Sequence, residues 1–145
     1  MSAATVFQSP RFTFVQPIGE TSDGVSIGVA PIAVLPRGLG LGQAVLDALE
    51  LSETTVIPRI SNWREFQPPL RAVPEYRNAE RRPGRLRACS VSRNEDGYSL
   101  TPMNRSDRYN YGFVTDSTVR LPLVATVLDL EQALQAVFNT APALT

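Results

Sequence analysis

The sequence predicts a single α/β domain of the α+β kind, in which two main helices pack on a small, mostly antiparallel sheet. The chain has 145 residues, of which 43% are hydrophobic, enough for one domain with a true core. Residues 86–103 have the pattern of a strand hairpin. Two further segments, 41–51 and 128–141, have the pattern of amphipathic helices. We therefore expect one domain over residues 1–145.

The N-terminal third predicts two strands before the first helix. In residues 11–17 the aromatic side chains alternate with smaller ones, which indicates a strand that ends at Pro17. Residues 19–24 are rich in turn formers. Residues 25–35 form a second strand region, where Pro31 indicates an edge position or a bulge.

The two helices have similar apolar stripes with i, i+3, i+4, i+7 spacing. The first stripe consists of Leu41, Ala44, Val45, Ala48 and Leu49. The second consists of Leu130, Ala133, Leu134, Val137 and Phe138. The two segments align at an offset of 89 residues. Helices of about eleven residues are marginal alone, so both need the sheet.

Between the two helices the amino-acid composition of the chain changes. Residues 60–66 predict one or two helical turns with Trp63 and Phe66 on one side. Residues 67–85 contain four prolines and many arginines, and this composition predicts an irregular, exposed connector.

The C-terminal half begins with the clearest local signal in the chain. Residues 86–93 and 98–103 predict two strands joined by an Asp-Gly turn at 94–97. A polar, aromatic loop follows at 104–112, and a strand pattern resumes at 113–124 before the last helix.

The residue types exclude most familiar catalytic machinery. The chain has no histidine and no lysine, which rules out Ser-His-Asp and Cys-His triads, Schiff bases and the P-loop lysine. Cys89 is the one cysteine, in a strand-like stretch, and predicts a buried structural thiol. We expect no catalytic residues, no metal, no cofactor and no small-molecule substrate, although an enzyme that uses carboxylates, tyrosine, serine or Cys89 stays open.

Nothing in the sequence predicts membrane insertion or export. No apolar run approaches the ~20 residues of a membrane helix. The N-terminus lacks a basic segment followed by an apolar one, so we expect no signal peptide and a cytoplasmic location.

The formal net charge is zero, but the charges are unevenly spread. Residues 1–57 carry a net charge of −3, residues 71–108 of +4 and residues 109–145 of −2. The basic middle leaves open a small Arg-rich nucleic-acid-binding or regulatory module. The neutral overall charge and the interleaved acids argue against nucleic acid as the partner. A protein partner is at least as well supported, because arginine and tyrosine are common anchors of protein interfaces.

Residues 104–114 are the most unusual polar stretch, with tyrosines, arginines and small polar residues side by side. Two interpretations remain open. The segment is either a long β connection whose tyrosines fold onto the edge of the core, or an adaptable recognition loop of the kind found in paratopes.

The order of these motifs resembles the small immunity proteins of contact-dependent growth inhibition, the CdiI type. The resemblance covers residues 39–140 and depends on "LGQAVLDALELS", "SNWREF", "ACSVSRNEDGYSLTPM", "GFV", "TVRLPL" and "DLEQALQAVF". The connector 67–85 has no counterpart in this pattern.

The resemblance implies a cytoplasmic, non-enzymatic bacterial protein that binds the C-terminal toxin domain of a CdiA-type protein. The complex would be one-to-one, the toxin a nuclease, and the result protection of the producing cell. A nuclease is basic around its substrate site, so exposed carboxylates can mimic phosphate. The candidate toxin-binding residues are Asp47, Glu50, Glu53, Asp107, Tyr109, Tyr111 and Asp116.

Overall fold

The computed structural model describes residues 2–82, 84–105 and 111–144, with only the backbone described for Arg105 and Tyr111. It contains one antiparallel sheet of eight strands, three α-helices and two short 3-10 helices. The strands are β1 (Ser2–Gln8), β2 (Phe12–Glu20), β3 (Ser26–Gly28), β4 (Ala33–Pro36), β5 (Arg87–Asn94), β6 (Gly97–Arg105), β7 (Tyr111–Phe113) and β8 (Val119–Leu121). The helices are α1 (Leu41–Thr54), η1 (Pro69–Ala72), α2 (Pro74–Glu80), η2 (Thr115–Ser117) and α3 (Val127–Thr140).

The strand order is β3-β2-β1-β5-β6-β7, and two further strands share the outer positions. β4 pairs with the first half of β2 while β3 pairs with its second half. In the same way, β8 and β7 pair with successive halves of β6. The long strands β1, β2, β5 and β6 therefore form the centre of the sheet, and short strands complete its edges.

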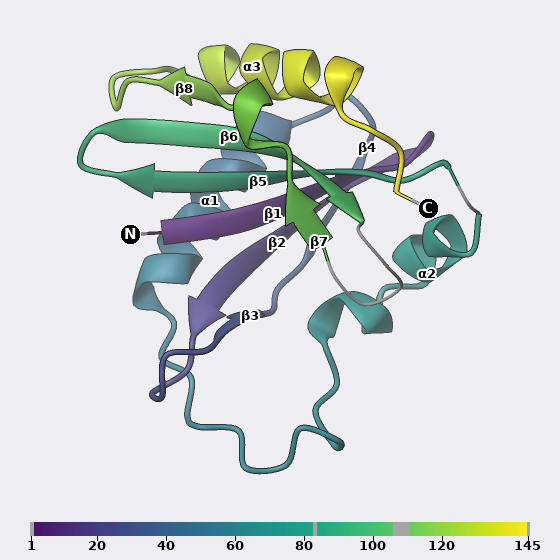
Figure 1. The fold of residues 1–145 in the computed structure, drawn as a ribbon, viewed down its shortest axis with the longest axis vertical. Helices are drawn as coiled ribbons and strands as arrows, with labels where there is room; N and C mark the ends of the chain where they lie inside the picture. The colour runs from purple at the N-terminus through teal and green to yellow at the C-terminus, as the bar shows by residue number, and fades with distance from the viewer. Residues whose placement is uncertain (1, 83, 106–110, 145) are drawn as a thin grey trace.

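One face of the sheet, which we call the helix face, is covered by α1 and α3. Figure 1 shows α1 behind the sheet and α3 along its upper edge. α1 packs against β1 and β2, and α3 packs against β5, β6 and β8. The core here combines sheet residues such as Val6 and Leu100 with Val45 and Leu49 of α1 and Phe138 of α3. The sheet thus shields the apolar stripe of each helix from water.

The opposite face, which we call the open face, is covered only in part. Phe7 and Phe14 point to this side and contact Tyr76 of α2, with ring centroids 5.2 and 5.5 Å apart in edge-to-face geometry. Tyr76 is only 3% exposed, so it fixes α2 on the sheet. Figure 1 shows α2 at the right, beside the ends of the strands.

The fold class predicted from sequence is confirmed, as are the central hairpin and both main helices. β5 and β6 pair from Ala88↔Met103 to Asn94↔Gly97. Gly97 has a φ of 132°, a backbone conformation that favours glycine at this turn.

Four local expectations are corrected by the structure. The N-terminal segment forms a central strand, β1, that was not expected. Pro17 does not end β2, which continues to Glu20. Residues 25–35 give two short strands, β3 and β4, rather than one. The connector 67–85 contains η1 and α2.

The segment 113–124 is also less regular than expected. It holds the end of β7, the turn η2 and only three residues of strand in β8. No helix within the described ranges is long and apolar enough to span a membrane.

Candidate interaction surface

The outward side of α1 carries an acidic stripe. The helix buries Leu41, Val45, Ala48 and Leu49 against the sheet. Helical periodicity then directs Asp47 and Glu50 to solvent, and both are exposed. Gln43 Nε2 donates a hydrogen bond to Asp47 Oδ1 at 2.9 Å, one turn earlier on the same side. The sequence prediction that these two carboxylates are solvent-facing is therefore confirmed.

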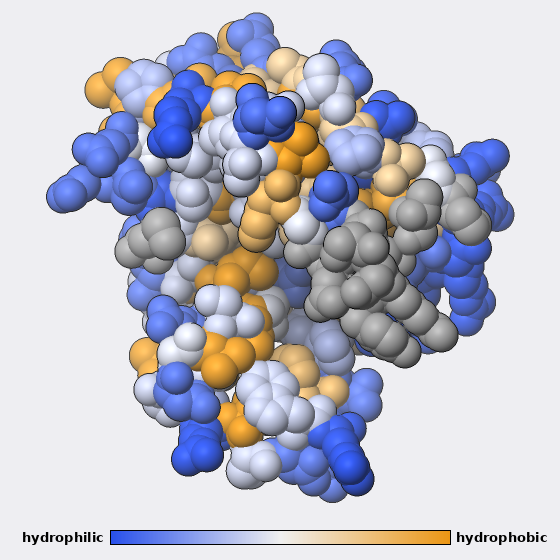
Figure 2. All heavy atoms as spheres, viewed as in Figure 1, coloured by the Kyte–Doolittle hydropathy of each residue, from blue (hydrophilic) through white to orange (hydrophobic). Residues whose placement is uncertain are grey.

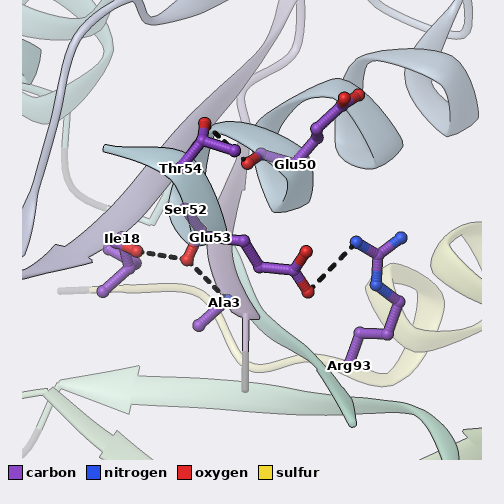
Figure 3. A network of polar contacts seen from close by, with 7 residues as sticks. All are labelled: Ala3, Ile18, Glu50, Ser52, Glu53, Thr54 and Arg93. Atoms are coloured by element: carbon purple, nitrogen blue, oxygen red, sulfur yellow. Dashed lines mark hydrogen bonds and ion pairs between the residues drawn. The ribbon is translucent and has the colours of Figure 1, made fainter. Parts of the chain in front are cut away.

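Glu53 is placed differently, because it has an intramolecular partner. Its Oε1 lies 3.4 Å from Nη2 of Arg93 on β5. The two side chains are 50% and 22% exposed, so this ion pair joins the end of α1 to the sheet from the surface. Figure 3 shows Glu53 directed toward Arg93, whereas Glu50 points away from it.

Ser52 anchors the same turn of α1 from the inner side. Its hydroxyl accepts a hydrogen bond from the Ala3 N–H at 3.0 Å and donates one to the Ile18 carbonyl oxygen. These contacts, drawn in Figure 3, join α1 to the start of β1 and to β2. The acidic stripe therefore lies on a helix that is held at its C-terminal end.

Asp116 is exposed in η2, on a separate segment from the α1 stripe. The neighbouring Thr118 hydroxyl lies 2.9 Å from the Thr101 hydroxyl. Thr101 alternates along β6 with Leu100, which is buried on the helix face, so η2 is tied to the open face. The structure therefore does not unite Asp116 with the acids of α1.

The remaining candidates from sequence cannot be placed. Asp107 and Tyr109 lie outside the described residues. Tyr111 belongs to β7, and only its backbone is described.

The open face has a band of hydroxyl and amide side chains that sequence analysis did not single out. The band follows paired positions across the sheet: Thr5, Gln16, Ser90 and Thr101. It lies next to the aromatic row beneath α2. The signal was present in the alternation of small polar with apolar residues along β5 and β6. Figure 2 shows pale and orange residues through the middle of this face, with strongly hydrophilic residues around the outline.

Trp63 offers an aromatic group at the surface. It is 47% exposed and contacts Phe66 edge-to-face, with ring centroids 5.6 Å apart. The residues form hydrogen-bonded turns, with Asn62 Oδ1 accepting from the Arg64 N–H at 3.1 Å. The expected placement of both rings on one side of a turn is confirmed.

The sequence prediction that Cys89 is a buried thiol is confirmed. Burial raises the pKa of the Cys89 thiol to about 12, and the side chain is fully buried on the helix face. A thiol with such a pKa is not a nucleophile at neutral pH. No cluster of three or more potential metal-binding side chains occurs among the residues that the structure describes.

Comparisons with known proteins identify likeness of fold but not of sequence. No protein-family model matches the chain, and no curated protein is significantly similar in sequence. A protein of unknown function from Neisseria meningitidis has a similar structure, with a TM-score of 0.69 and 12% identity over 97% of this chain and 94% of that one.

A chain of the CdiA-CT/CdiI toxin and immunity complex from Yersinia pseudotuberculosis is also similar. It gives a TM-score of 0.67 and 12% identity over 97% of both chains. At this identity the comparison shows a shared fold, along nearly the whole chain.

Proposed function

We propose that this chain is an immunity protein that binds and neutralises the C-terminal toxin domain of a cognate CdiA-type protein. The complex is one-to-one and forms in the cytoplasm of the producing cell. The observation that carries the proposal is the fold shared over 97% of the chain with a chain of a toxin and immunity complex. An immunity protein needs a rigid surface and no catalytic group, which agrees with the lack of histidine and the buried Cys89.

The contact surface in this proposal includes the acidic stripe of α1. Asp47 and Glu50 present carboxylates that can occupy phosphate positions on a nuclease, and Glu53 extends the stripe toward β5. Opposite charge accelerates encounter between the two proteins and orients them. Asp107, Tyr109, Tyr111 and Asp116 stay proposed as a second contact.

The direct test uses the C-terminal domain encoded immediately upstream of this chain. We expect its expression in a bacterial host to stop growth and co-expression of this chain to restore it. Isothermal titration calorimetry on the purified proteins should give a one-to-one complex. Growth arrest that this chain fails to relieve, together with no measurable binding, would exclude the function.

Charge reversal on α1 tests the contact surface. D47K/E50K should weaken toxin binding about 10- to 100-fold by removing two exposed carboxylates from the contact. The matched control is E95K/D96K in the exposed β5–β6 turn, which changes the net charge equally and should bind within about threefold of wild type. If both variants bind the toxin with equal affinity, α1 is not part of the interface.

A further inference from the structure

Arginines from distant parts of the sequence surround a hollow at one end of the sheet. A depression of about 540 Å³ lies between the β1–β2 turn and the C-terminal end of α2. A second one of about 380 Å³ adjoins it and shares Ser9, Pro10 and Arg85. We name the pair the arginine hollow after the side chains that line it: Arg11, Arg37, Arg81, Arg82, Arg85 and Arg87.

One wall of the arginine hollow is the β1–β2 turn, which hydrogen bonds of the Ser9 hydroxyl hold closed. The Ser9 hydroxyl accepts from the Phe12 N–H at 2.9 Å and donates to the Phe12 carbonyl oxygen at 3.1 Å. Ser9 itself is only 5% exposed. The Arg37 N–H donates to the Arg11 carbonyl oxygen at 3.0 Å, which brings a second segment alongside. These hydrogen bonds therefore fix the backbone from which the Arg11 and Arg37 side chains extend.

The other wall is the end of α2 and the segment that follows it. Tyr76 fixes α2 on Phe7 and Phe14, as described above. The Arg81 N–H continues the helical pattern by donating to the Arg77 carbonyl oxygen at 3.2 Å. Phe12 and Ala79 supply apolar lining between the charged groups. The arginine hollow is therefore a shaped site and not only a charged surface.

Most of the positive charge in the arginine hollow is unpaired within the described residues. Arg87 donates to the carbonyl oxygens of Phe138 and Ala141 at the end of α3. Arg11, Arg81 and Arg82 are exposed, and the described part of the chain offers them no ion pair. Glu75 is the one acid among the described lining residues. Six arginines that converge with one acid among them indicate an anionic ligand.

The arginine hollow and the acidic stripe of α1 lie at opposite ends of β1. Ser52 and Glu53 are held near Ala3 and Arg93, at the start of β1, whereas Gln8 at the other end of the strand lines the hollow. The acidic stripe and the arginine hollow are thus separated along the strands. A partner that spans the strands meets the carboxylates of α1 and the guanidinium groups of the hollow at different places.

We propose that the arginine hollow binds a carboxylate-rich segment of the toxin domain, an inference that rests on the proposed function. Planar guanidinium forks bind carboxylates in bidentate geometry, and several can act on one acidic segment. A protein ligand is favoured over nucleic acid because the chain has no net positive charge. The two charged ends then fix one orientation of the toxin on the immunity protein.

The first experiment measures toxin affinity for two variants with equal charge change. We expect R81E/R82E to weaken binding about tenfold or more, and R64E/R120E, both exposed and outside the arginine hollow, to stay within about threefold of wild type. If wild type binds the toxin and R81E/R82E binds equally well, the inference alone is overturned. If wild type does not bind, the proposed function is overturned. Circular dichroism should show that both variants are folded.

The second experiment uses probes that do not depend on the toxin. A fluorescent polyglutamate peptide should bind wild type and R64E/R120E at low salt and R81E/R82E at least about tenfold more weakly. No binding by wild type would overturn the inference. Tighter binding of a duplex DNA of about 20 base pairs than of the peptide at about 0.15 M salt would overturn it in favour of a nucleic-acid site.

Discussion

At the scale of single residues, Ser52 shows that sequence patterns predict which side chains of a helix are exposed better than they predict which ones hold the helix on the sheet. The exposure of Asp47 and Glu50 follows from helical periodicity alone, and the structure confirms it. The partners of Ser52 are backbone groups of Ala3 and Ile18, 49 and 34 residues away. Every residue type except proline has both groups, so no local pattern predicts the contact.

Removal of the Ser52 hydroxyl should destabilise the fold. In Ser52→Ala the Ala3 N–H and the Ile18 carbonyl oxygen lose their partner in a partly buried place, which costs about 1–3 kcal/mol. Thr54→Ala is the control, because the Thr54 hydroxyl donates only to the Glu50 carbonyl oxygen in an exposed turn. Its effect should stay within about 0.5 kcal/mol. Urea unfolding measures both, and equal midpoints would show that Ser52 does not anchor α1.

At the scale of elements, local signals predicted both main helices and the β5–β6 hairpin but missed β1 and α2. α1, α3 and the β5–β6 hairpin have clear periodicity. β1 is almost completely buried on both faces, so its sequence lacks the alternation of a half-buried strand. In the connector, Pro74 is one of the prolines that predict irregular chain, but it occupies the first turn of α2, where proline is tolerated.

Loss of the Tyr76 ring should release α2 from the sheet. Tyr76→Ala removes the contacts with Phe7 and Phe14 and should cost about 3–5 kcal/mol of unfolding free energy. Arg77→Ala, at an exposed position of the same helix, should cost about 0.5 kcal/mol or less. Urea unfolding gives the free energies, and limited trypsin digestion at the arginines that follow α2 should accelerate only in Tyr76→Ala. Unchanged digestion would mean that α2 is held by other contacts.

At the scale of the whole molecule, the charge distribution was visible in sequence but its geometry was not. The basic middle of the chain was evident, yet Arg11 and Arg37 belong to the acidic N-terminal part. Only the antiparallel return of β2 and the placement of α2 bring them beside Arg81 and Arg85. Tertiary proximity across so many residues has no periodic signature, so the arginine hollow could not be predicted.

Cys89 reports on the stability of the whole fold, because β5 is a central strand and packs against α3. Burial raises the pKa of its thiol from 9.0 to about 12. The folded state therefore holds this proton more strongly than the unfolded state. Its contribution to stability is complete below about pH 9 and is lost as the pH rises toward 12.

The expected result is a steeper loss of stability in wild type than in Cys89→Ala above about pH 9, with a difference of at most about 1.4 kcal/mol per pH unit. Urea unfolding between about pH 8 and 11 measures this difference, and the other titrating groups are common to both proteins. A thiol reagent at about pH 8 should modify wild type only when urea unfolds it. Parallel pH profiles, or rapid labelling of the native protein, would contradict the burial of Cys89.

The first turn of α1 meets the start of α3 so closely that position 42 has no room for a side chain. A Cβ at residue 42 would lie 2.5 Å from the Val127 carbonyl oxygen and 2.7 Å from Cγ of Glu131. The Gly42 N–H instead donates to Glu131 Oε1 at 3.1 Å. Because the nearest atom belongs to the backbone of residue 127, a shorter side chain at position 131 would not make room for a side chain at position 42. Position 42 should therefore remain glycine among homologous chains, whichever residue stands at 131.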